Sequence, residues 1–164
     1  MSLPEGQPEE GVVQLLQGTS AWEPLGNLSL RPWIRARLAE AYGKAGHADK
    51  GLSLLAEALD WMDRRKEAWC QAEVLWMKGE LLSMQGHEAE AESAFQQAID
   101  VARRQQAKFW ELRATVCLCR LWQQQGKQEH ARQMLAEITG WFTQGFDTRH
   151  LQEAKTLLDE LGSP

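Results

Sequence analysis

The chain has 164 residues, of which 43% are apolar and 25% are charged. That length and composition suit one folded domain with a buried core and exclude a disordered chain. The net charge of −5 argues against a nucleic-acid or anionic-membrane partner, because both attract clustered lysine and arginine. No apolar run approaches the roughly 18 residues of a membrane span, and the three cysteines without an export signal indicate a cytoplasmic protein.

Apolar residues recur at helical spacing along nearly the whole chain, and no segment alternates as a strand would. Residues 1–7 are expected to be a tag or a disordered N-terminus. Pro24 and Gly26 predict a break after the first helix, and Ser29 is expected to cap the second. The predicted helices are 8–23, 31–45, 48–64, 66–85, 87–105, 107–125, 127–143 and 148–161.

A repeat of 40 residues organises these helices. Gly46, Gly86 and Gly126 are spaced by 40, and a glycine suits the left-handed end of the first helix of a pair. Small residues in two further columns would let paired helix backbones approach closely, and large residues in a third would fill the space beside them. The two columns of small residues are Ala39, Gly79 and Cys119, and Gly51, Ala91 and Ala131. The column of large residues is Leu55, Phe95 and Leu135.

The repeat predicts a single domain over residues 8–164. Its parts would be a half repeat at 8–23, repeats at about 31–65, 66–106 and 107–143, and a capping helix at 148–161. The half repeat suggests a cut through a longer array, whereas the last helix has the one-sided apolar pattern of a terminal cap.

These columns resemble the tetratricopeptide repeat, which places small, bulky, small, aromatic and alanine residues along a helix pair. The best match is to Gly79, Leu82, Ala91, Phe95 and Ala98. The period is 40 instead of the usual 34, and Arg103 stands where a proline is usual, so the resemblance is to a long-helix type. It implies an all-α fold, a right-handed superhelix of helix pairs.

A narrower resemblance covers about residues 9–161. Several phrases are similar to the C-terminal repeat region of bacterial adenylate or guanylate cyclases that carry a predicted ATPase domain. That resemblance implies a sensory or interaction role within a larger signalling protein. The phrases lie at residues 38–42, 78–82, 91–99, 110–114 and 145–148.

Motifs for chemistry are absent. Gly43-Lys44 lacks the upstream glycine of a phosphate loop, and no helix carries a zinc-binding histidine pair. Cys117 and Cys119 are two residues apart, so a helix would point them in different directions. We therefore expect no enzymatic activity, no cofactor and no metal.

The candidate partner-binding groove is the concave face that first helices line in such arrays. Trp33 and Trp76 are its candidate aromatic anchors, although Trp76 suits the core equally well. The period places Glu73 beside Arg113 and Glu80 beside Arg120, either as ion pairs between repeats or as charges for a partner. The candidate residues are Trp33, Glu40, Glu73, Trp76, Glu80, Met84, Arg113, Arg120 and Gln124.

The sequence therefore predicts a protein-interaction or regulatory scaffold module. Its partner would be a protein or peptide segment, including another domain of the parent chain. The alternative is a self-association module, a homodimer formed through the N-terminal edge with no peptide ligand.

Overall fold

The computed structural model describes residues 8–22, 28–145 and 148–162, and these ranges contain helices and turns but no strand. Within them, every helix is too short or too polar to span a bilayer. The elements are α1 (Pro8–Trp22), the short 3-10 helix η2 (Leu28–Leu30), α2 (Arg31–Lys44), α3 (Ala48–Arg65), α4 (Gln71–Met84), α5 (Glu88–Arg104), α6 (Lys108–Gln124), α7 (Gln128–Trp141) and α8 (Arg149–Gly162).

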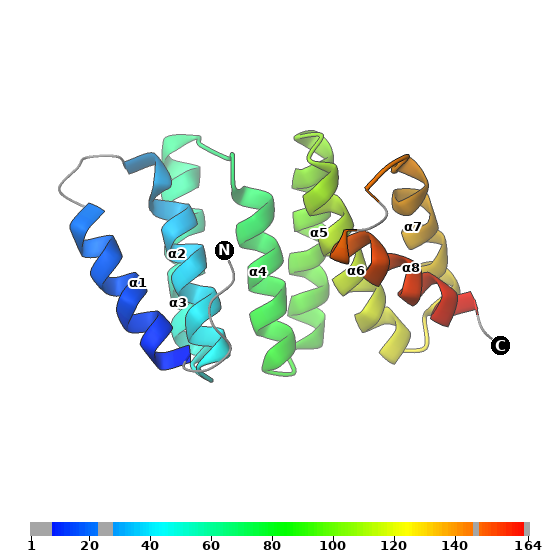
Figure 1. Ribbon diagram of the computed structural model, residues 1–164, viewed down its shortest axis with the longest axis horizontal. Coiled ribbons are helices and arrows are strands. Elements are labelled where there is room, and N and C mark those ends of the chain that lie inside the picture. Colours follow the sequence, from blue (N-terminus) through cyan, green and yellow to red (C-terminus); the bar gives the residue numbers. More distant parts are fainter. Residues whose placement is uncertain (1–7, 23–27, 146–147, 163–164) are drawn as a thin grey trace.

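The helices form two layers of a curved stack (Figure 1). Neighbours in the series α2, α4, α6 and α8 contact one another directly, whereas contacts of that extent do not join α1, α3, α5 and α7 in the described ranges. The layer whose helices lie closer together is the inner side of a curved stack, so α2, α4, α6 and α8 line the concave face. The expected all-α superhelix of helix pairs is confirmed.

Left-handed residues end the helices at regular intervals. Gly46, Gly86 and Gly126 have φ values of +78°, +77° and +77°, which confirms the glycine column as the turn between paired helices. Lys66 and Gln106 adopt φ values of 57° and 55° in the turns between repeats.

Two predicted helix boundaries differ from the structure. The left-handed Lys66 ends α3, so the next helix begins at Gln71 and not at residue 66. Ser29 does not cap α2, because the N-cap is Leu30 and no side chain bonds there. The Ser29 carbonyl instead accepts a hydrogen bond from Trp69 Nε1 at 3.2 Å.

Small residues allow close helix contacts at the predicted columns. A Cβ atom on Gly51 would lie 2.9 Å from the carbonyl oxygen of Ala39. The same column brings Cys119 Sγ to 3.2 Å from the Ala131 carbonyl oxygen. A Cβ atom on Gly79 would lie 2.5 to 2.9 Å from the Phe95 ring. The backbones therefore approach as closely as these side chains permit.

Alanine substitution at two helical glycines should have opposite effects. Gly79→Ala should lower the free energy of unfolding by about 1 to 3 kcal/mol, because the fully buried Phe95 ring cannot yield to the new methyl group. Gly18→Ala should raise it by about 0.5 to 1 kcal/mol, since nothing lies within 4 Å of the added Cβ and alanine favours helix. Urea denaturation followed by far-UV circular dichroism measures both, and an equal effect at the two sites would contradict close packing at Gly79.

Candidate partner-binding groove

The nine predicted groove residues all lie on the inner helices α2, α4 and α6, but their exposure differs. Met84 (62%), Trp33 (39%), Arg120 and Gln124 are exposed, and Glu40, Glu80 and Arg113 are half-buried. Glu73 and Trp76 are only 6% and 7% exposed. The burial of Trp76 favours its packing role, because its ring is not open to a partner.

The ion pairs differ from those that the 40-residue period predicts. Glu73 pairs with Arg37 of α2, not with Arg113. Arg37 also bonds Glu40 at 3.0 Å, and Lys44 reaches the same carboxylate at 3.1 Å. In the 40-residue repeat, the α2 residue equivalent to Glu73 is Trp33. Arg37 lies one helical turn after Trp33, and its side chain is long enough to cross to Glu73 on α4. For Glu80 and Arg120, the ion pairs of the described residues include no contact within 4 Å.

The Glu73 carboxyl group is held in a partly apolar environment. Burial raises the pKa of this carboxyl above its ordinary value, although the charges of Arg37 and Arg113 oppose the shift. Its role is to join the inner helices, with Arg37 on one side and the field of Arg113 on the other.

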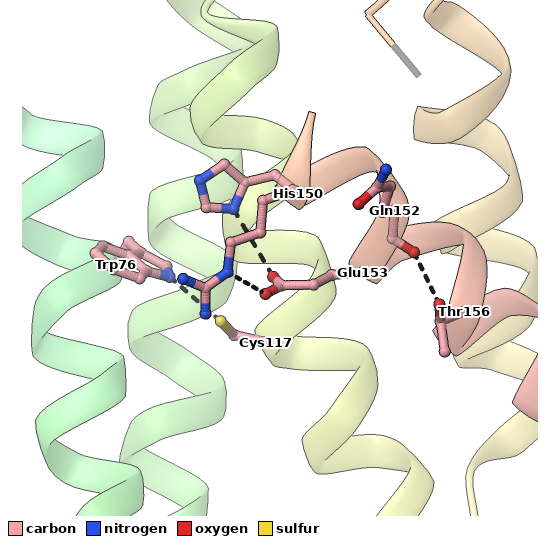
Figure 2. Close-up of polar contacts among 7 residues, drawn as sticks. Trp76, Cys117, His150, Gln152, Glu153 and Thr156 are labelled. Carbon is pink, nitrogen blue, oxygen red and sulfur yellow. Dashed lines mark hydrogen bonds and ion pairs between the residues drawn. The ribbon is translucent and has the colours of Figure 1, made fainter. Parts of the chain in front are cut away.

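Trp76 is the support of a second cluster, on α4 and α6. Its indole Nε1 donates a hydrogen bond to Cys117 Sγ at 3.3 Å (Figure 2). The Arg113 guanidinium carbon lies 3.8 Å from the Trp76 ring centroid, and Trp110 packs against the same ring with centroids 6.0 Å apart. Trp76 therefore positions a cation at the groove surface.

Helix α8 extends the groove beyond the predicted residues. Figure 2 shows His150 and Glu153 on α8 across from Trp76 and Cys117. His150 Nδ1 lies 3.8 Å from Glu153 Oε2, and the His150 ring packs edge-on against Phe109 with centroids 5.2 Å apart. Burial, and then the charge of Arg113, lower the pKa of His150. The nine predicted groove residues do not include Glu153, although the 40-residue repeat places it one period after Arg113.

A hollow of about 280 Å³ opens beside the α2 end of the groove. It lies between α1 and α2 and is mostly apolar, and one of the nine predicted groove residues, Trp33, contributes to its wall. The described residues that line it are Gln14, Leu15, Gly18, Leu30, Trp33, Ile34 and Arg37.

The side chains of this region do not suggest catalysis. Among the described residues, no three of the histidine, cysteine and acidic side chains converge as a metal would require. Burial raises the pKa of Cys70 and Cys119 to about 12, and burial likewise raises the pKa of Cys117. These thiols stay protonated at neutral pH, a state that is neither a good nucleophile nor a metal ligand.

A second buried glutamate provides a contrast to Glu73. Glu111, in the first turn of α6, accepts hydrogen bonds from Arg103 Nε at 2.8 Å and Lys108 Nζ at 2.7 Å. Burial alone would raise the pKa of Glu111, but these two cations outweigh it and hold the pKa below its ordinary value.

The two glutamates should respond differently to removal of their charge. Glu111→Gln should lower the free energy of unfolding by about 1 to 3 kcal/mol at neutral pH, because it weakens two charge-assisted hydrogen bonds. Glu73→Gln should leave it within about 0.5 kcal/mol of wild type or raise it, because burial of the Glu73 charge carries a desolvation cost. Urea denaturation of both variants beside wild type makes the comparison.

The pH dependence of these differences in the free energy of unfolding is the control for the comparison. The folded pKa of Glu111 is depressed, so its contribution is present above the unfolded value of about 4.3 and is lost as pH falls through the folded pKa. The gap between wild type and Glu111→Gln should therefore narrow as the pH falls through the folded pKa of Glu111. The folded pKa of Glu73 is raised, so wild type should gain stability over Glu73→Gln on acidification. A gap for Glu111→Gln that does not change with pH would contradict the ionic contribution.

Comparison with known proteins agrees with this fold. The tetratricopeptide repeat family model matches residues 30–104, which run from η2 to the end of α5. This is a tetratricopeptide-type fold. Among curated proteins, none matches the sequence.

Solved structures of similar fold include nearly identical TPR-like repeats from a Podosopora anserina protein assigned as a kinesin light chain. The superposition has a TM-score of 0.72 at 17% identity and covers 95% of this chain and 78% of that one. A variant of the same repeats gives a TM-score of 0.69 at 17% identity, covering 96% and 86%.

These matches support the repeat type and the fold. Tetratricopeptide repeats generally mediate protein–protein interaction and act as scaffolds without catalysis. The narrower resemblance to the repeat region of bacterial cyclases has no support among the matches, and neither does an ATPase domain.

Proposed function

We propose that the concave face binds a protein or peptide segment and that the chain is an interaction or regulatory scaffold module. The observation that carries this is a row of charged and aromatic side chains that crosses all four inner helices. The row runs from Arg37 and Glu40 on α2, through Glu73 on α4 and Arg113 on α6, to Glu153 on α8.

Apolar side chains are also exposed on the inner helices α2, α4 and α6. Met84 on α4 is 62% exposed, Phe109 on α6 is 47% exposed and Trp33 on α2 is 39% exposed. Methionine and aromatic side chains adapt well to partner surfaces, and they are enriched at interfaces. A mixed surface of this kind suits a peptide with both apolar and charged residues.

The wider biological setting is part of the proposal. The resemblance of several phrases to cyclase repeat regions supports a place in a cytoplasmic bacterial signalling protein, where the partner would be another protein or another domain of the same parent. The acidic net charge of −5 supports a protein partner over nucleic acid or a membrane.

A charge-matched pair of variants tests the groove. Met84→Glu with Arg120→Glu changes two exposed inner-face residues, and Gln97→Glu with Arg104→Glu makes the same charge change on exposed positions of the outer helix α5. In a pull-down from a lysate of the source organism, wild type and the α5 variant should retain a protein that the groove variant loses. Equal retention by all three would contradict the groove assignment, provided that circular dichroism shows equal helicity.

Self-association is the second candidate, and it rests on the outward face of α1. Val13 is 51% exposed on this helix, which contacts the rest of the array through α2. An apolar face at the end of a stack is suited to pairing with a second copy.

The mass in solution tests this candidate. If α1 mediates pairing, sedimentation equilibrium should show a mass that rises with concentration for wild type and stays monomeric for Val13→Glu. An Arg104→Glu control on α5 should behave as wild type. A monomeric wild type at every concentration would exclude self-association and leave the groove proposal unaffected.

A further inference from the structure

Within the described part of the chain, Arg113 packs against three aromatic rings. Its guanidinium carbon lies 3.8 Å from the ring centroid of Trp76, 5.1 Å from that of Trp110 and 5.7 Å from that of Phe109. Rings of this kind attract the charge through their faces. They offer no acceptor in the plane of the guanidinium, where its five N–H groups point.

No acceptor comes from the rest of the described chain. The hydrogen bonds and ion pairs formed by residues 8–22, 28–145 and 148–162 include none to Arg113, whereas Arg37 bonds both Glu40 and Glu73. Arg113 is nevertheless half-buried, and burial lowers its pKa. N–H donors that have lost part of their water and gained no acceptor bind an incoming acceptor more strongly than fully hydrated ones.

The surrounding charges leave Arg113 available. Glu73 is engaged by Arg37, and Glu153 receives a hydrogen bond from Arg149 at 2.9 Å. The charge of Glu80 acts on Arg113 only at longer range, where it opposes the lowering of the guanidinium pKa by burial. The positive field also reaches α8, because the charge of Arg113 contributes to the lowered pKa of His150.

We propose that Arg113 binds one side-chain carboxylate, from an aspartate or glutamate, of a peptide segment that lies along the groove. This inference rests on the proposed function and specifies the chemistry of the partner. A carboxylate matches the planar fork of a guanidinium with two parallel hydrogen bonds, and the Trp76 stack fixes the plane in advance. Arg113 lies on the third of four inner helices, so a segment that crosses the groove presents a side chain there.

The same surface limits the ligand further. Glu40, Glu73, Glu80 and Glu153 lie on the inner helices, so a run of acidic residues would be repelled and a single carboxylate fits best. Phe109, which is 47% exposed beside Arg113, offers apolar contact to the residue next to that carboxylate.

A peptide display experiment on the full chain tests this proposal. A random dodecapeptide library is selected on wild type, on Arg113→Gln and on Arg104→Gln, which removes an exposed arginine from the outer helix α5. Wild type and Arg104→Gln should enrich an aspartate or glutamate at one internal position, and Arg113→Gln should not. Equal thermal unfolding of the three proteins is the folding control.

A double-mutant cycle with one selected peptide then measures the coupling between its acidic residue and Arg113. Replacing its acidic residue with the amide should weaken binding to wild type about 10- to 100-fold and should leave binding to Arg113→Gln nearly unchanged. Arg113→Lys keeps the charge without the fork, so it should recover only part of the affinity.

The outcomes separate this inference from the proposed function. Selected peptides without a common carboxylate, or with one that does not couple to Arg113, would overturn the inference while the groove proposal stands. Enrichment of a free C-terminus alone would assign the carboxylate to the chain end and overturn the side-chain proposal. If no peptide is enriched on wild type, the groove proposal fails and the inference fails with it.

Discussion

The close approach of helix backbones at small residues is the constraint on which the rest of this structure depends. Cys119 Sγ lies 3.2 Å from the Ala131 carbonyl oxygen, and any side chain at Gly51 would press on Ala39. Tight pairs let each inner helix also contact the inner helices on either side. That spacing produces the concave face, and it brings side chains from four helices within reach of one another.

Within the groove, buried side chains hold the charged side chains that lie nearer the surface. Glu73 and Trp76 are the most deeply buried of the predicted site residues, and each holds an arginine of a neighbouring helix: Glu73 binds Arg37, and Trp76 lies beneath Arg113. The two arginines differ because only Arg37 has carboxylate partners among the described residues. The supporting side chains thus determine which charges are already neutralised and which remain for a partner.

The sequence was sufficient for the fold because its information is periodic. A glycine every 40 residues marks the turns that the structure places at φ near +77°, and the small columns identify the helix contacts. The boundary at Lys66 could not be predicted, because a left-handed lysine has no local signature and is imposed by the turn between repeats.

The site was predicted in part. The repeat placed all nine residues on inner helices. It could not show which arginine pairs with Glu73, because that depends on how the helices cross and on the length of the Arg37 side chain. Burial of Trp76 depends on Trp110 and Arg113 together, and this is a property of three side chains on two helices. The position of Glu153 could be predicted from the sequence, since the same 40-residue step from Arg113 leads to it.

The fit of Leu81 has a consequence for the history of the array. Its side chain enters a notch between Gly43 on α2 and Gly51 on α3, where a Cβ atom at either glycine would overlap it. The equivalent of Leu81 in the first repeat is Ala41. A tandem duplication of the first repeat would therefore set an alanine against the notch and leave a cavity in its place. The repeats share one architecture, yet they are no longer interchangeable units, and their order is fixed by the shape of a single junction.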